Sequence, residues 1–130
     1  MINQWIQTGS DTLASLLVNL NEKGGFPIAL LTDYQGFPIA SASKADQDPQ
    51  RQAATVALIQ KTVTQASDQL GLDETDEFSL FDASGQRLVC RPFSVNGDNM
   101  ILAILIPDRN QSYRRLTNNT LNAVRRQWEL

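Results

Sequence analysis

Apolar residues first recur with helical spacing near the start of the chain. The leucines between residues 13 and 20 follow one another at intervals of three and one, which places them on one face of a helix. Ser10 is a typical residue for the start of such a helix, and the pair Gly24-Gly25 is typical of its end. We expect that this helix, or a short one before it, begins near residue 2, because the same spacing recurs at Ile2, Trp5 and Ile6.

A longer helix is predicted between Pro49 and Gly71. Its main apolar stripe repeats at intervals of three and four residues, through Val56, Ile59, Val63, Ala66 and Leu70. A second patch of small and apolar residues lies away from that stripe, at Ala53, Ala54, Ala57 and Leu58. A surface helix that buries only one face does not need this patch, so the patch indicates a further contact.

Five shorter runs have the length and apolar content of β-strands. We expect these strands at residues 26–32, 37–42, 78–82, 87–93 and 99–106. Glycine-containing turns at 33–36, 83–86 and 96–98 predict hairpins between successive strands. A final helix is expected from about Ser112 to Trp128.

The order of elements, α-ββ-α-βββ-α, predicts an α/β (α+β) fold. The runs 26–32 and 99–106 are apolar on both faces and therefore belong in the middle of a sheet between helices. Placing them side by side gives a five-stranded mixed sheet in the order 2-1-5-4-3, with the strands numbered along the chain. The middle helix then covers one face and the terminal helices cover the other. Strand 78–82 becomes a free edge that a partner has to cover.

Residues and motifs that the sequence lacks exclude several classes of functional site. The chain has no histidine, which excludes histidine-based triads, general bases and metal sites. It also lacks the GxxxxGK[ST] and GxGxxG motifs of nucleotide-binding loops. A net charge of −3 argues against nucleic-acid binding.

The remaining bulk properties predict a protein of the cytoplasm. A lone cysteine fits a reducing compartment, and the N-terminus lacks the layout of a signal peptide. The longest apolar run, Met100–Ile106, is too short to span a bilayer, so no membrane insertion is expected. We expect residues 1–130 to form a single domain that needs no cofactor.

Neither the acidic residues nor Cys90 predicts a catalytic or metal site. Cys90 lies in an apolar strand, where we expect a buried and inert thiol, and strand alternation puts Arg91 on the opposite face. Two acidic groups lack the ligand spacing and central glycine of a calcium loop, and we expect them to be solvated charges. These groups are Asp46 and Asp48, and the connector residues Asp73, Glu74, Asp76 and Glu77.

Three segments follow one another between residues 10 and 128: the hairpin GFPIALLTDYQGFPIASA, the alanine-rich helix RQAATVALIQKTVTQASDQLG, and a meander from FSLFDASGQRLVCRPF to MILAILIP before an arginine-containing helix. In this order, and in the turn D-x-x-G-x-P-I-A-S-A from Asp33 to Ala42, the chain resembles the Roadblock family. That family was named for a dynein light chain, and its bacterial members act alongside Ras-like GTPases.

The resemblance implies homodimers with a ten-stranded continuous sheet and two paired central helices. It also implies a role as scaffold, activating partner or exchange partner of a small GTPase. No catalytic residue is carried over from the family. The edge strand and the second helical patch then predict a dimer contact at Ala53, Ala54, Ala57, Leu58, Phe78 and Leu80, although alanine also simply favours helix.

The last helix predicts a basic face. At about 100° per residue, Arg114, Arg115, Arg125 and Arg126 share one arc, and the apolar residues opposite them pack on the sheet. One interpretation is a solvated face with cations near a helix C-terminus. The other is a docking surface for an acidic partner.

We therefore predict a non-catalytic homodimer that binds a Ras-like small GTPase and modulates its nucleotide cycle or its localisation. The alternative is a small-molecule-sensing or adaptor module of similar α/β fold without a GTPase partner. Such a sensor needs a cavity, which the sequence does not reveal.

Overall fold

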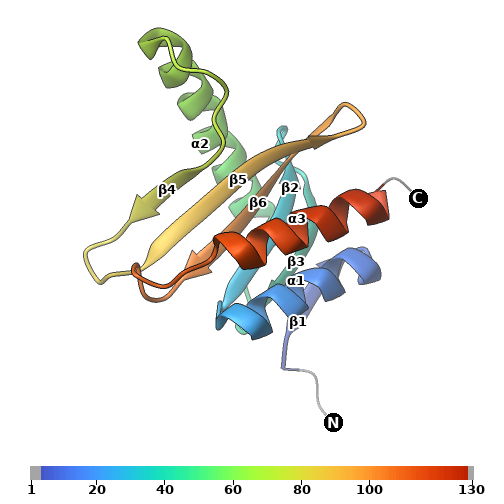
Figure 1. The fold of residues 1–130 in the computed structure, drawn as a ribbon. Helices are drawn as coiled ribbons and strands as arrows, with labels where there is room; N and C mark the ends of the chain where they lie inside the picture. Colours follow the sequence, from blue (N-terminus) through green and yellow to red (C-terminus); the bar gives the residue numbers. More distant parts are fainter. Residues whose placement is uncertain (1–3, 129–130) are drawn as a thin grey trace.

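The computed structural model describes residues 4–128, which form one antiparallel sheet with helices on both faces (Figure 1). The elements in chain order are β1 (Ile6–Gly9), α1 (Asp11–Gly24), β2 (Ile28–Asp33), β3 (Pro38–Ser43), α2 (Pro49–Leu70), β4 (Phe78–Phe81), β5 (Arg87–Val95), β6 (Asp98–Ile106) and α3 (Arg114–Trp128).

The sheet has six strands in the order β1-β3-β2-β6-β5-β4, and every pairing is antiparallel. The predicted five-stranded mixed sheet is corrected in three respects: β1 adds a sixth strand beside β3, the full strand order changes accordingly, and no pairing among the described strands is parallel. The five predicted strands themselves follow one another in the expected order 2-1-5-4-3, as β3-β2-β6-β5-β4. The helical spacing that includes Trp5 and Ile6 is misleading here, since Ile6 pairs with Ser43 at the edge of the sheet. Ile2 lies outside the described residues.

The helices divide between the two faces of the sheet. α1 and α3 pack together on one face of the sheet (Figure 1). The larger core lies on this face, around Leu17, Phe26 and Met100. α2 lies on the other face over a smaller core that includes Leu30 and Cys90. The central strands β2 and β6 are buried on both faces, as their continuous apolar runs predict.

Local signals at the ends of α1 and α2 are confirmed. The Ser10 side chain accepts a hydrogen bond from the Leu13 amide, and the Asp48 carboxylate accepts one from the Arg51 amide. Gly25 and Gly71 end the two helices in the left-handed conformation that glycine adopts without strain. These short-range contacts fix where each helix begins and ends.

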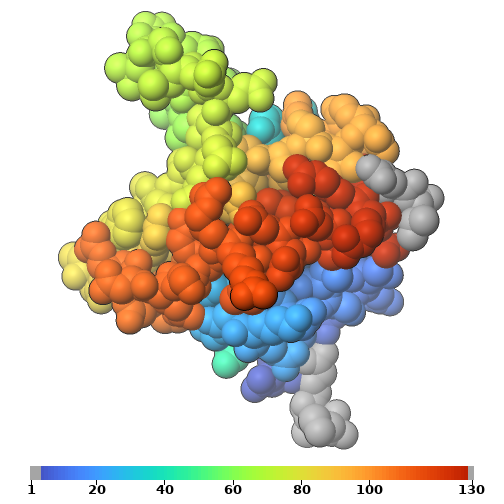
Figure 2. Space-filling view, in the orientation of Figure 1, coloured from blue at the N-terminus to red at the C-terminus, as the bar shows by residue number. Residues whose placement is uncertain are grey.

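α2 is longer than the part of the sheet that it covers. Its 22 residues span about 33 Å at 1.5 Å per residue. Burial ends at Gln60, and the second half of the helix projects from the body of the molecule (Figures 1 and 2). The predicted apolar stripe is therefore not a core stripe throughout, because Ala66 and Leu70 are exposed where no sheet lies beneath them.

Gly9, at the end of β1, lies too close to β3 for any side chain. Its φ is +85°, and a Cβ there would lie 2.1 Å from the Ile39 carbonyl oxygen. We expect Gly9→Ala to detach β1 and to lower the free energy of unfolding by about 2–3 kcal/mol, measured by urea denaturation. Gly85→Ala is the matched control, since its φ is +97° but no atom lies within 4 Å of the added Cβ. Equal losses for the two variants would mean that the close approach has no energetic effect.

Candidate interaction surfaces

The residues predicted for a dimer contact do not share one exposed surface. Ala53 and Ala57 are buried against the sheet of their own chain, whereas Ala54 and Leu58 are exposed. The expectation that the whole patch faces outward is therefore corrected. Small side chains at positions 53 and 57 let α2 approach its own sheet. On the flank with Ala54, the turn between β2 and β3 also comes close, because a Cβ on Gly36 would lie 3.0 Å from the Ala54 Cα.

The opposite flank of α2 borders an uncovered part of the sheet. An apolar groove of about 360 Å³ lies there, between the N-terminal half of the helix and strands β2, β5 and β6. Its floor includes the half-buried side chains of Ile28, Leu88 and Leu105. α2 thus covers only part of this face, and apolar surface beside it stays open to solvent.

β4 is the outermost strand at one edge of the sheet, next to β5. Within residues 4–128 it pairs only with β5. The prediction of a free edge here is confirmed. Phe78 and Leu80 lie opposite Cys90 and Leu88 in the register, so they share the face that α2 covers. Leu80 is 53% exposed. An open edge with exposed apolar side chains is a template for pairing with another strand.

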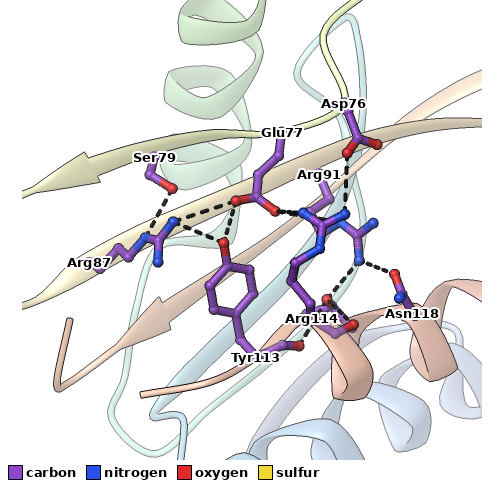
Figure 3. A network of polar contacts seen from close by, with 9 residues as sticks. Asp76, Glu77, Ser79, Arg87, Arg91, Tyr113, Arg114 and Asn118 are labelled. Atoms are coloured by element: carbon purple, nitrogen blue, oxygen red, sulfur yellow. Dashed lines mark hydrogen bonds and ion pairs between the residues drawn. The ribbon is translucent and has the colours of Figure 1, made fainter. Parts of the chain in front are cut away.

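Glu77, immediately before β4, binds groups from β5 and from the start of α3 (Figure 3). Its carboxylate lies 2.7 Å from Arg114 Nη1, 3.5 Å from Arg87 Nη2 and 3.9 Å from Arg91 Nε, and it accepts a hydrogen bond from the Tyr113 hydroxyl. The Glu77 side chain is only 15% exposed. The prediction that the acidic connector is merely solvated is therefore wrong for Glu77.

Arg91 is the most buried cation of this network. Its Nη1 donates to Thr117 Oγ1 and to Asn118 Oδ1 on α3. Burial and the neighbouring Arg114 lower the pKa of the Arg91 guanidinium, and the charges of Asp76 and Glu77 partly offset this lowering. Desolvation and the hydrogen bond to Glu77 raise the pKa of the Tyr113 phenol, so Tyr113 remains a donor at neutral pH. The network thus ties the start of the edge strand to α3.

The four arginines predicted to form a docking face have different surroundings. Arg114 is held by the Glu77 network, and the Arg125 guanidinium lies 5.5 Å from the ring centroid of Phe93. Arg115 and Arg126 are exposed, and neither forms an ion pair with another described residue. The basic surface that is open to a partner is therefore narrower than the predicted stripe and centres on these two residues.

Cys90 is buried, as predicted, and it lies on the α2 side of the sheet. Burial raises the pKa of its thiol to about 12. We expect the native protein to resist a thiol reagent at about pH 8 and to react only after unfolding, which a colorimetric thiol assay with and without urea would show. Because the folded pKa is raised, this thiol stabilises the fold below pH 9.0, and the contribution declines as pH rises toward about 12. Rapid labelling of Cys90 in the native protein would contradict the prediction of an unreactive thiol.

No group of three histidine, cysteine, aspartate or glutamate side chains within residues 4–128 could hold a metal ion. No helix in the same range is long and apolar enough to cross a bilayer.

The Glu77 network is not predicted by the sequence pattern. One signal for it was present, because Arg87 and Arg91 are four residues apart on one strand and so lie on the same face. Two arginines on a buried strand face require a counter-charge. The sequence does not reveal that Glu77, ten residues before Arg87, supplies it.

Solved structures share this fold. MglB of Myxococcus xanthus is 16% identical, with a TM-score of 0.77 over 92% of this chain and 96% of that chain. A Roadblock/LC7 domain from Streptomyces avermitilis is 19% identical, with a TM-score of 0.73 over 95% and 100%. An MglB with a tetrameric arrangement is 19% identical, with a TM-score of 0.71 over 89% and 87%. No protein-family model matches the sequence, and no curated protein matches it. The structural likeness establishes that the chain has the Roadblock-type fold.

Proposed function

We propose that this chain is a non-catalytic, homodimeric Roadblock-like domain, comprising residues 1–130, that binds a Ras-like small GTPase in the cytoplasm and modulates its nucleotide cycle or localisation. The observation that carries the proposal is the combination of the Roadblock-type fold with an open apolar face beside α2 and β4. The GTPase partner is what the sequence resemblance to the Roadblock family implies.

The homodimer is supported by the position of the exposed apolar residues. Leu80 on β4, and Leu70 and Leu72 at the projecting end of α2, are all more than half exposed. Pairing of β4 with β4 of a second copy would cover Leu80 and the open strand edge together. Two copies of this six-stranded sheet would then form twelve continuous strands rather than the ten expected from sequence.

A projecting α2 also fits a two-fold contact. In an antiparallel arrangement, the C-terminal half of one α2 lies beside the N-terminal half of the other. Leu70 and Leu72 would then lie near the partner's apolar groove, whose floor includes Leu88 and Leu105. Each copy would supply both the projecting apolar residues and the groove that receives them, as a self-complementary interface requires.

The basic face of α3 is the proposed contact for an acidic surface of the GTPase. Arg115 and Arg126 lie about 20° apart around the helix, at 100° per residue, and are exposed. We expect Arg115→Glu with Arg126→Glu to slow association with the GTPase and to remove its salt dependence, while the fold stays intact. The measurement is surface plasmon resonance over a range of ionic strengths.

The control for this double variant reverses the same amount of charge elsewhere. Lys23→Glu with Lys61→Glu changes two exposed lysines on α1 and α2 and should leave association unchanged. If the α3 variant associates at the native rate at every ionic strength, α3 is not the docking surface.

The GTPase partnership itself is tested by capture and by nucleotide binding. Ras-like GTPases from the source organism, loaded with GDP or with a non-hydrolysable GTP analogue, are passed over the immobilised chain. We expect one nucleotide state to be retained, and labelled GTP not to bind the chain alone, because no phosphate-binding loop is present. Tight binding of GTP by the chain, or retention of neither nucleotide state, would contradict the proposal.

A further inference from the structure

A polar pocket of about 430 Å³ lies between the projecting half of α2, the connector that follows it, and the adjacent end of the sheet. This volume is within the range of small-molecule sites, about 300–1,000 Å³. None of its described lining residues belongs to β4 or to α3, and its walls include Tyr34 from the β2–β3 turn, Leu72 after α2 and Ser94 from β5. It is therefore distinct from the α3 docking face, and it borders the proposed dimer contact at Leu72.

The pocket walls carry negative charge. Asp68 from α2 and Asp73 and Glu74 from the connector line it, and none of its lining residues is a lysine or arginine. The ion pairs of the Glu77 network do not involve these three carboxylates. A cleft with one sign of charge attracts ligands of the other sign.

Gln60 places a buried hydrogen-bond acceptor on the same wall. The residue is only 4% exposed, and its Nε2 donates to Thr64 Oγ1 at 3.2 Å. Its Oε1 has no hydrogen-bond partner among the described residues. A buried amide oxygen is stable only with a donor beside it, and Gln60 otherwise borders an apolar core. The oxygen atom is itself enclosed, so a donor in the pocket would satisfy it once the Gln60 amide turns toward the pocket.

Tyr34 adds a neutral wall rather than another charge. Burial and the charge of Glu74 raise the pKa of its phenol, so the hydroxyl remains protonated. The half-buried ring presents an aromatic surface on which a cation can rest.

The spacing of the acidic groups selects among cations. No three carboxylates within residues 4–128 converge closely enough to hold a metal ion. A guanidinium or alkylammonium group with several N–H donors can instead reach separate acceptors across a pocket of this size.

We propose that this pocket binds an organic cation carrying a guanidinium or alkylammonium group, through the Gln60 amide oxygen and the carboxylates of Asp68, Asp73 and Glu74. The cation can come from a free small molecule or from an arginine or lysine side chain of a partner, and the chemistry of recognition is the same. The proposal goes beyond the GTPase partnership and does not depend on it.

The test is calorimetric titration of the full chain with butylguanidinium and with butylurea, its neutral isostere. We expect saturable binding of butylguanidinium in the millimolar range, which suits so small a ligand, and binding of butylurea at least about tenfold weaker. Added salt should weaken the binding of butylguanidinium and leave the binding of butylurea unchanged. Absence of saturation, or equal binding of the two compounds, would overturn the proposal.

Two variants locate the site. Asp73→Asn with Glu74→Gln, and separately Gln60→Met, should each weaken butylguanidinium binding by about tenfold or more. Asp11→Asn with Glu22→Gln removes two exposed carboxylates from α1 and should leave it unchanged. Because Gln60→Met alters a buried position, its folding is checked by thermal denaturation. If Gln60→Met does not fold, the double variant Asp73→Asn with Glu74→Gln tests the site alone. If the double variant Asp73→Asn with Glu74→Gln binds butylguanidinium with native affinity, the proposed site is wrong.

Competition distinguishes the two sources of the cation. If saturating butylguanidinium releases a captured GTPase, the pocket takes a side chain of that partner, and if capture is unaffected, the pocket takes a free molecule. Either result is compatible with the pocket. Titration of the chain without any GTPase separates a failure of the GTPase proposal from a failure of this one.

Discussion

Leu80→Lys should convert the proposed dimer into a folded monomer. Leu80 is already half exposed on the open strand β4, so the change costs the isolated chain little. In the proposed β4–β4 contact, however, it would bury two unpaired ammonium groups. We expect the dimer dissociation constant to rise by at least about 100-fold, since 1.4 kcal/mol corresponds to a factor of ten. Sedimentation velocity over the micromolar range measures the mass directly.

Phe37→Lys is the matched control for this variant. Phe37 is 69% exposed, more than Leu80, but it lies next to the β2–β3 turn, and β4 is at the far edge of the sheet. The same charge introduced there should leave the dimer intact. Ala57→Glu is not a useful probe, because Ala57 is buried in its own chain and the variant would unfold it. A native chain that is monomeric at micromolar concentration would refute the dimer.

What the sequence predicted correctly depends on short-range contacts. The start of α2 at Asp48 and Pro49 and its end at Gly71 follow from side chains that cap the nearest backbone groups. The Asn96-Gly97 turn is similar, since both residues adopt positive φ, which asparagine and glycine tolerate best. Such signals act within a few residues and can be identified without knowing the fold.

What the sequence mispredicted depends on the position of other elements. Periodicity showed two apolar stripes on α2, but it does not indicate which stripe faces the sheet or where the sheet ends. Ala53 and Ala57 face inward, and Leu70 projects beyond the sheet. β1 was missed for a related reason, because four residues become a strand only when β3 offers its edge.

The Glu77 network shows the same limit for charges. Glu77 lies in a run of acids that is typical of a solvated connector. Only the fold brings it next to Arg91 and Tyr113, 14 and 36 residues farther along the chain. The burial that makes Glu77 important is a property of the assembled sheet and α3.

Glu77→Gln should be among the most destabilising single changes of a polar side chain here. Glutamine keeps the shape of the side chain but removes the charge that faces Arg91, which is 7% exposed and has no other carboxylate within ion-pair distance among the described residues. We expect the free energy of unfolding to fall by about 2–3 kcal/mol, below the 3–5 kcal/mol of a fully buried pair, because Glu77 keeps some solvent contact. Urea denaturation measures this loss.

Asp76→Asn provides the comparison within the same network. The Asp76 side chain is 76% exposed and, within residues 4–128, pairs only with Arg114. Its loss should therefore lower the free energy of unfolding by less than about 1 kcal/mol, and this difference should disappear at high salt. Adding Arg91→Met to Glu77→Gln should recover part of the stability, because the uncompensated cation is then removed. Equal losses for the two acidic variants would mean that Glu77 is merely a surface charge. Since Glu77 lies immediately before β4, its variant should also weaken the proposed dimer, whereas Leu80→Lys should weaken the proposed dimer and leave the stability of the monomer unchanged.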